Sequence, residues 1–348
     1  MAETLEKRDI RQLDLEQIKD FFIGIGEQPF RAKQVHEWLW KKSAKDFDSM
    51  TNISLATREK LKAHFDIKHI KVDNLQRSND GTVKNAVKLH DGLIVESVLI
   101  PTETRITACI SSQVGCSLDC HFCATARLKR MRNLNPDEIY DQVVAIKEQG
   151  ETYFQRPLTN IVYMGMGEPL LNYKNVLASI EKITSPDGLG ISPKRITLST
   201  VGIPKMIKQL ADDDVKFNLA VSLHSAIDES RSKLMPINQK SNLEELAESL
   251  QYWHSKTNKK VTFEYVIWKD INDDEKHARA LAKYCGKVAS KVNIIEYNPI
   301  DDGEFQQADP ESLTMYQRIL EGKGIIVNVR RSRGKDIDAA CGQLANKS

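Results

Sequence analysis

The spacing of apolar residues changes along the chain, and the first part is helical in character. Up to about residue 66, apolar positions recur three and four residues apart in LEQIKDFFIGIG, RAKQVHEWLWKK and SLATREKLKAHF. This spacing gathers apolar side chains on one face of a helix. The pattern predicts a small N-terminal helical unit.

From about residue 69 the runs become short and rich in β-branched residues: HIKVDNLQ, VKNAVKLH and LIVESVLIP. The segments SNDGT and HDG, which have the composition of turns, separate them. We therefore expect an N-terminal helical accessory domain over residues 1–68, which could dock RNA or serve only for packing, a short β-rich connector over 69–92, and a main domain over 93–348.

Beyond residue 105 apolar strands alternate with helical or loop segments. The strands are RITACISSQ, LTNIVYMGMG, KRITLST, FNLAVSLHS, KVTFEYVIW and KVNIIEYNP, and GIIVNVRRS could be one more. Such alternation indicates a parallel sheet with right-handed crossovers. Eight units would close a full TIM barrel, so six predict an α/β fold with a partial, open (βα)6 TIM-like barrel.

Composition narrows the cellular setting. The chain has 348 residues, 41% of them hydrophobic, which suits one large core and a small accessory domain. Its start is charged, and no apolar run of 18 residues follows, so we expect a cytoplasmic protein without a membrane span. A net charge of +2 leaves room only for local basic patches, such as RLKRMR and VRRSRGK, which could be solvated or could grip phosphates. We expect a monomer.

Polar residues follow the apolar runs directly. MGMGEP, LST, SLHS and YNP each end a predicted strand, and a loop with three cysteines follows the first strand of the main domain. In parallel α/β folds the chemistry gathers where strands end. Five strand ends therefore point to one site.

The three clustered cysteines, Cys116, Cys120 and Cys123, have the spacing C-x3-C-x2-C. Six cysteines in a chain of this length do not indicate a disulfide framework. Structural zinc normally takes four protein ligands, for which His121 would be an awkward fourth. A [4Fe–4S] cluster held by three thiolates would keep one iron open, as a catalytic metal centre does for its substrate.

With Phe122 before its last cysteine, this loop resembles the radical S-adenosylmethionine (SAM) superfamily. The resemblance implies a [4Fe–4S] cluster whose open iron chelates SAM, an electron donor outside the protein, and reductive cleavage of SAM to a 5′-deoxyadenosyl radical. It also implies that Gly167 and Glu168 contact the amino group of SAM. Alone, a Gly-Glu-Pro sequence would be read as a turn.

Further motifs resemble the RlmN/Cfr family of dual-specificity RNA methyltransferases from residue 15 to 345. They are VESVLIP, ACISSQVGC, MGMGEPLLN, LSTVG, SLHS, RSKLMPIN, YNP and DIDAACGQL. The resemblance implies two SAM molecules per turnover, with Cys341 methylated first and then joined to RNA. Glu96 would accept a proton, and Cys109 would attack the Cys341 sulfur to leave a transient disulfide. Further SAM contacts implied are Ser199, Ser222, Leu223, His224 and Asn298.

The chemistry of the substrate agrees with such a route, because carbon 2 of adenine is electron-poor and cannot displace methyl from a sulfonium. A proton acceptor and a second thiolate are suited to resolving the covalent adduct. The alternative for Glu96 is an ordinary solvent-facing carboxylate, because it alternates with valines in a strand-like run. We expect Cys285 to be a small buried residue without a catalytic role. We predict a mobile loop around Cys341, since it must be positioned for two events.

Three functions stay open. The first is methylation of adenosine carbon 2 in 23S ribosomal RNA and of a transfer RNA adenosine beside the anticodon. The second is carbon-8 methylation of the same ribosomal base, which Val114 disfavours because the carbon-8 group has cysteine there. The third is a zinc-stabilised RNA-binding protein without catalysis.

Overall fold

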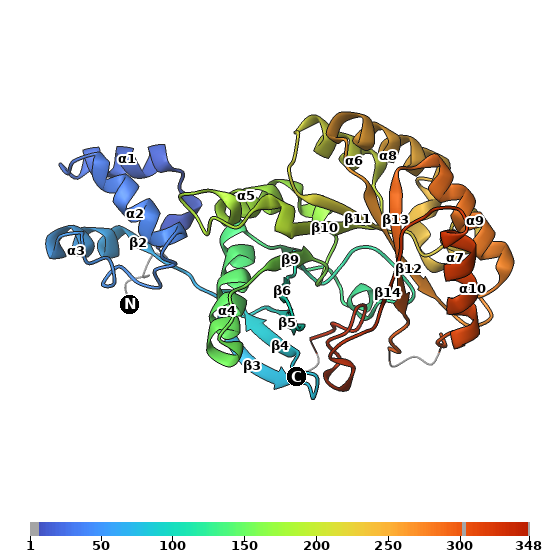
Figure 1. The fold of residues 1–348 in the computed structure, drawn as a ribbon. Helices are drawn as coiled ribbons and strands as arrows, with labels where there is room; N and C mark the ends of the chain where they lie inside the picture. The colour runs from blue at the N-terminus through green and yellow to red at the C-terminus, as the bar shows by residue number, and fades with distance from the viewer. Residues whose placement is uncertain (1–6, 301–303, 347–348) are drawn as a thin grey trace.

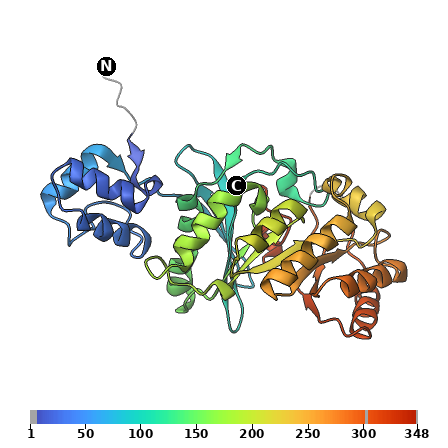
Figure 2. The ribbon, with the colours of Figure 1, turned by 90° about the horizontal axis from the view of Figure 1, so that it is seen from above.

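The computed structural model describes residues 7–300 and 304–346 (Figure 1). A small helical unit comes first and stands to one side of the remaining chain (Figure 2). Its elements are β1 (Arg8–Asp9), the 3-10 helix η1 (Ile10–Gln12), α1 (Leu15–Gly24), α2 (Phe30–Trp40), α3 (Leu55–His64) and β2 (Phe65–Asp66).

The helices of this unit follow from its sequence. Asp14 caps α1 by accepting the Gln17 N–H, and the Gln17 side chain accepts the Asp14 N–H in return. Such a capping box satisfies two amide groups that a helix start leaves unpaired. Apolar residues at helical spacing, including Ile18, Phe22 and Val35, are fully buried between the helices.

The rest of the chain is built on one open ten-stranded sheet, in the order β14-β13-β12-β11-β10-β9-β6-β5-β4-β3. From β6 to β14 all neighbours are parallel, whereas β3, β4, β5 and β6 pair antiparallel. The strands are β3 (Lys71–Arg77), β4 (Val83–Lys88), β5 (Ile94–Pro101), β6 (Ile106–Cys109), β9 (Asn160–Tyr163), β10 (Ile196–Thr200), β11 (Asn218–Ser222), β12 (Val261–Ile267), β13 (Ser290–Glu296) and β14 (Val327–Arg330).

The expected fold class is confirmed: the six predicted strands form a parallel, open barrel-like sheet, and β14 extends it by one. All seven residues of β12 are buried, as is typical of a parallel strand covered on both faces. The expected connector over 69–92 contributes β3 and β4 to this same sheet, and its boundaries stay a prediction.

Helices follow the parallel strands and cover the outside of the sheet (Figures 1 and 2). They are α4 (Pro136–Phe154), α5 (Tyr173–Thr184), α6 (Pro204–Asp212), α7 (Asp228–Leu234), α8 (Leu243–Thr257), α9 (Glu275–Lys287) and α10 (Pro310–Glu321). Shorter elements are β7 (Gln113–Val114), β8 (Arg132–Asn133), η2 (Ala124–Arg127), η3 (Pro169–Asn172), η4 (Pro193–Arg195), η5 (Pro236–Gln239) and η6 (Lys335–Ile337). No helix in the described ranges is both long and apolar enough to span a bilayer.

A buried ionic cluster joins the N-terminal unit to α4. The Arg11 guanidinium contacts Asp9 at 3.2 Å, Asp137 at 3.4 Å and Asp141 at 2.8 Å, and it donates to the Lys68 carbonyl. His69 adds a contact of 3.2 Å to Asp141. We call these residues the junction cluster.

Candidate active site

Glu96 and Cys109, which the sequence predicted to be catalytic, share one face of the antiparallel strands with Lys84. In the register, Lys84 lies opposite Val98, which lies opposite Cys109, and Glu96 is two residues before Val98. Because side chains alternate between faces, Lys84, Glu96 and Cys109 project from the same side. Asn85 projects from the other side and hydrogen-bonds Gln149 of α4, so the first side is the interior face.

The cysteine loop, residues 116–123, follows β6 and is anchored at several backbone positions. The His121 N–H donates to the Leu234 carbonyl at 3.1 Å, and the Ala124 N–H just beyond the loop donates to Gly342 at 2.8 Å. No disulfide joins its cysteines. Burial raises the pKa of Cys116 to about 11 and that of Cys120 well above its usual value, and the neighbouring Cys123 adds to both rises.

Gly167 and Glu168 follow β9 and lie against Gln113. Gly167 has a φ of +91°, and a Cβ there would come within 2.4 Å of the Gln113 side chain, so glycine is required. The Glu168 carboxylate is buried and accepts N–H groups from Leu170 and Val201 at 3.0 and 2.9 Å. Burial raises its pKa to about 7, against the Val201 hydrogen bond.

The other expected SAM contacts lie at the carboxyl ends of neighbouring strands. Ser199 is half-buried near the end of β10, Ser222 ends β11, and Leu223 follows it fully buried. His224 comes next, with a φ of +58° and its ring 4.7 Å from Phe122 of the cysteine loop. Burial, and next the charge of Arg231, lower the pKa of His224 to about 3, so its ring is neutral.

Arg231 of α7 hydrogen-bonds to backbone carbonyls at these strand ends. Its guanidinium is buried and donates to the carbonyls of Leu223, Val201 and Ser222, and to the Asn238 side chain. Burial lowers its pKa to about 10. Arg231 is the first residue of the motif RSKLMPIN, and the sequence alone did not predict this role for it.

The C-terminal segment, residues 341–346, crosses the interior face and reaches β5 (Figure 1). The Cys341 carbonyl accepts from Asn298 at 3.3 Å, and the Leu344 carbonyl accepts from Thr125 at 2.6 Å. The segment therefore connects the region after β13, η2 just beyond the cysteine loop, and β5, which are far apart in sequence.

Cys341 lies close enough to Cys109 to affect the ionisation of the Cys109 thiol. Burial, and second the neighbouring Cys341, raise the pKa of Cys109 to about 12. Cys341 is partly exposed to solvent. Desolvation of its thiol by the surrounding protein raises the pKa of the thiol, and the Arg330 guanidinium opposes that rise. Glu264 holds Arg330 at 3.1 Å.

Glu96 is 1% exposed and has contacts on both carboxylate oxygens. Oε1 lies 3.4 Å from the Lys84 ammonium, which is also buried. Oε2 accepts the backbone N–H groups of Ala345 and Asn346 at 2.9 and 3.2 Å. The reading of Glu96 as a solvent-facing carboxylate is therefore wrong. The sequence pattern gave Lys84 no role, because its contact with Glu96 depends on the register of β4 against β5.

The residues present fit a cluster and SAM by their chemistry. The cysteine loop offers three thiols without disulfides, and the buried Asn298 Oδ1 has no hydrogen-bond partner among the described residues. An unpartnered buried acceptor suits a ligand that carries N–H or O–H donors. Within the described ranges, no three histidine, cysteine or acidic side chains are already arranged around a single metal ion.

Several charges of the two basic tracts are paired within the protein. Arg132 contacts Asp91 and Glu138, and Lys335 contacts Glu296. Arg330, as described, faces the cysteines. Fewer charges than the sequence suggested are therefore available for phosphates.

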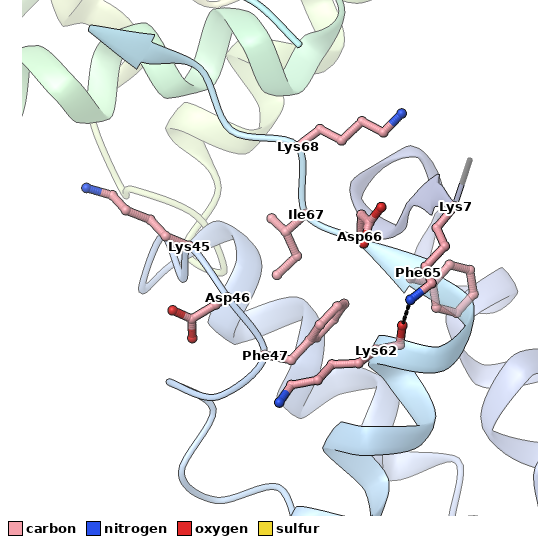
Figure 3. Close-up of a pocket in the computed structure, with 9 residues that line it drawn as sticks. All are labelled: Lys7, Lys45, Asp46, Phe47, Lys62, Phe65, Asp66, Ile67 and Lys68. Carbon is pink, nitrogen blue, oxygen red and sulfur yellow. Dashed lines mark hydrogen bonds between the residues drawn. The ribbon is translucent and has the colours of Figure 1, made fainter. Parts of the chain in front are cut away.

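A pocket of about 430 Å³ lies on the N-terminal unit. In Figure 3, Phe47 and Ile67 point toward one another at its centre, and the lysine side chains spread around its rim. The lining residues are Lys7, Lys45, Asp46, Phe47, Lys62, Phe65, Asp66, Ile67 and Lys68.

Comparisons with known proteins agree with this fold and site. The Radical SAM superfamily model matches residues 110–282, and the model of the ribosomal RNA large subunit methyltransferase N-terminal domain matches residues 8–67. A solved radical SAM methyltransferase from Sphaerobacter thermophilus superposes with a TM-score of 0.91 at 35% identity, covering 97% of this chain and 99% of that one. The protein is thus a radical SAM methyltransferase.

Curated relatives define its family more closely. A probable dual-specificity RNA methyltransferase RlmN from Christiangramia forsetii is 66% identical over 98% of this chain and 97% of its own. One from Flavobacterium johnsoniae, with the same description, is 65% identical over 99% and 98%. The chain belongs to the RlmN family of dual-specificity RNA methyltransferases. Membership implies a [4Fe–4S] cluster, SAM and an RNA substrate.

Proposed function

We propose that the enzyme methylates carbon 2 of a specific adenosine in the peptidyl-transferase region of 23S ribosomal RNA, and of a transfer RNA adenosine beside the anticodon. The observation that carries this proposal is the meeting of Cys109, Cys341 and Glu96 around one interior face. A proton acceptor and two thiols are what a covalent RNA adduct needs for its resolution. The description of the relatives as dual-specificity enzymes supports two RNA substrates.

Cys116, Cys120 and Cys123 would hold the cluster. Gly167, Glu168, Ser199 and the other strand-end residues would hold SAM, with Asn298 Oδ1 free to accept a donor from it. When bound, the cluster and SAM supply a 5′-deoxyadenosyl radical, with the electron coming from an external donor. We infer a monomer that uses two SAM molecules per turnover.

The chain's own residues then divide the remaining work. Cys341 accepts a methyl group by displacement from the first SAM, and after activation it is joined to adenine through a methylene link. Glu96 accepts the ring proton. Once the adduct has passed its unpaired electron to an external redox partner, the Cys109 thiolate attacks the Cys341 sulfur, and the sulfur–methylene bond breaks with its electron pair on carbon. The methylene carbon takes up a proton to become the methyl group of the released RNA, and a Cys109–Cys341 disulfide remains for a cellular thiol reductant.

Mass spectrometry of ribosomal RNA nucleosides from cells lacking the gene tests this function. We expect 2-methyladenosine to disappear and to return with the wild-type gene. Disappearance of 8-methyladenosine instead would establish the carbon-8 reaction. Anaerobic reconstitution with iron and sulfide should give a brown protein that cleaves SAM under reduction, which a zinc-stabilised binding protein cannot do.

We also infer that the N-terminal unit docks RNA through the lysines around its pocket. Their present partners support this, because the Lys62 contacts to Asp48 and Glu59 and the Lys45 contact to Glu148 are exposed ion pairs. Exposed pairs are worth only about 0.2–1 kcal/mol and can be exchanged for phosphate contacts at little cost.

A further inference from the structure

Lys84 is a buried cation that the proposed mechanism does not use. Its side chain is 4% exposed, and its ammonium lies 3.4 Å from the equally buried Glu96 carboxylate. Among the described residues, Glu96 has no other charged group within ion-pair distance. The groups that face it from other elements are Lys84 of β4 and the two N–H groups of the C-terminal segment, while its own N–H contacts the Met166 sulfur.

Stability alone is a weak reason to bury such a pair. Removing two charges from water is costly, and apolar residues of similar volume often serve a core at least as well. Both residues lie on the interior face, beside Val98 and in line with Cys109. A lone ion pair on the same face as the Cys109 thiol points to a chemical use.

The two oxygens of Glu96 differ in how permanent their contacts are. Lys84, the second residue of β4, approaches Oε1 from a strand that is paired on both sides. The donors at Oε2 are backbone N–H groups of residues 345 and 346, which lie outside any helix or strand. Substrate that displaces the C-terminal segment would leave Oε2 facing the adenine and Oε1 still facing Lys84.

We propose that Lys84 is a positioning residue for the proton-transfer step, holding the Glu96 carboxylate oriented while Oε2 accepts the ring proton of the RNA adduct. In that step the C–H bond breaks, its electron pair stays on the base, and an O–H bond forms on Glu96. The proposal rests on the proposed function of Glu96 and extends it. Without Lys84, Oε1 would lose its one charged partner among the described residues, and the carboxylate would no longer be held in the orientation that presents Oε2 to the adduct.

The test follows the separate steps of a single turnover in anaerobically reconstituted holoenzyme with substrate RNA. Lys84→Met removes the charge at similar length, Lys84→Arg keeps it, and Lys88→Met is the matched control on an exposed position of the same strand face. Peptide mass spectrometry measures Cys341 methylation, which does not need Glu96. Denaturing gels measure the lifetime of the protein–RNA adduct.

We expect Lys84→Met to methylate Cys341 normally and to resolve the adduct about 10²-fold more slowly. Lys84→Arg should recover most of the rate, and Lys88→Met should match wild type. Resolution by Lys84→Met at the wild-type rate, or no rescue by arginine in a protein that melts normally, overturns the proposal.

A double variant keeps the test decisive if Lys84→Met folds poorly. Glu96→Gln with Lys84→Met removes both buried charges together. If Lys84 acts through Glu96, the double variant resolves the adduct as slowly as Glu96→Gln alone, whereas multiplied losses contradict the proposal. A wild type that methylates RNA without methylating Cys341 refutes the proposed covalent mechanism, and the role of Lys84 falls with it.

Discussion

The protein buries charge in two places, and it does so differently in each. At the junction cluster, Arg11 contacts three carboxylates and a backbone carbonyl, and His69 adds a further contact to Asp141. On the interior face, Lys84 and Glu96 form a single ion pair, and the other contacts of the Glu96 carboxylate come from a segment near the chain end.

The difference separates a structural use of charge from a chemical one. A guanidinium surrounded by acceptors on fixed elements has nothing left to exchange, so the junction cluster holds the N-terminal unit against α4. A carboxylate held partly by a segment outside the helices and strands can change partners when substrate arrives. Variants on the interior face should therefore lose RNA methylation, whereas variants at the junction cluster should lose stability.

The largest expected effect is on turnover at the interior face. Cys341→Ala should lower RNA methylation by at least about 10³-fold, because a covalent mechanism loses its attachment point. Its melting temperature should stay near that of wild type, since solvent already reaches Cys341. Nucleoside mass spectrometry measures the product, with Cys285→Ala as the cysteine control. Normal methylation by Cys341→Ala would refute the mechanism.

The next largest effect is on stability at the junction cluster. Arg11→Met leaves Asp9, Asp137 and Asp141 without their cation, and breaking a buried ion pair costs about 3–5 kcal/mol. Chemical denaturation measures the loss, and Arg8→Met on the exposed neighbouring residue is the control. The surviving folded enzyme should still methylate Cys341. A variant as stable as wild type would show that the junction cluster does not hold the unit.

A smaller, pH-dependent effect concerns His224, whose pKa burial lowers to about 3. The unfolded ring has a pKa near 6.5, so the unfolded state binds a proton first as pH falls. The contribution of neutral His224 to the free energy of unfolding is therefore fully present above about pH 6.5 and is lost as the pH falls toward 3. Between pH 7.5 and 5 it should fall by about 2 kcal/mol.

Comparison with His224→Gln isolates this contribution, because burial moves the pKa of Glu168 in the opposite direction and partly masks it in wild type. The difference in unfolding free energy between the two proteins should change by about 2 kcal/mol over that range. If the difference in unfolding free energy between the two proteins did not change with pH, His224 would take up its proton equally well in the folded and the unfolded state, and the prediction would be wrong.

These contrasts also explain what the sequence could predict. Long apolar runs such as β12 made the parallel sheet predictable, and C-x3-C-x2-C marked the cysteine loop, because both signals are local. The pairing of Lys84 with Glu96 depends on the register of β4 against β5, and Arg11 meets Asp141 across 130 positions. Single-sequence patterns carry no information on such partners.

The smallest expected effect is at Lys45, whose ion pair with Glu148 spans from the N-terminal unit to α4. Both side chains are more than half exposed, so breaking the pair should cost at most about 1 kcal/mol. Lys45→Ala and Glu148→Gln both break it, but only the first removes the lysine charge. If Lys45 contacts phosphate, Lys45→Ala alone should weaken RNA binding and lower the slope of log affinity against log salt by about 1. Equal RNA affinity in the two variants would assign Lys45 to the junction and leave RNA docking to other lysines of the pocket.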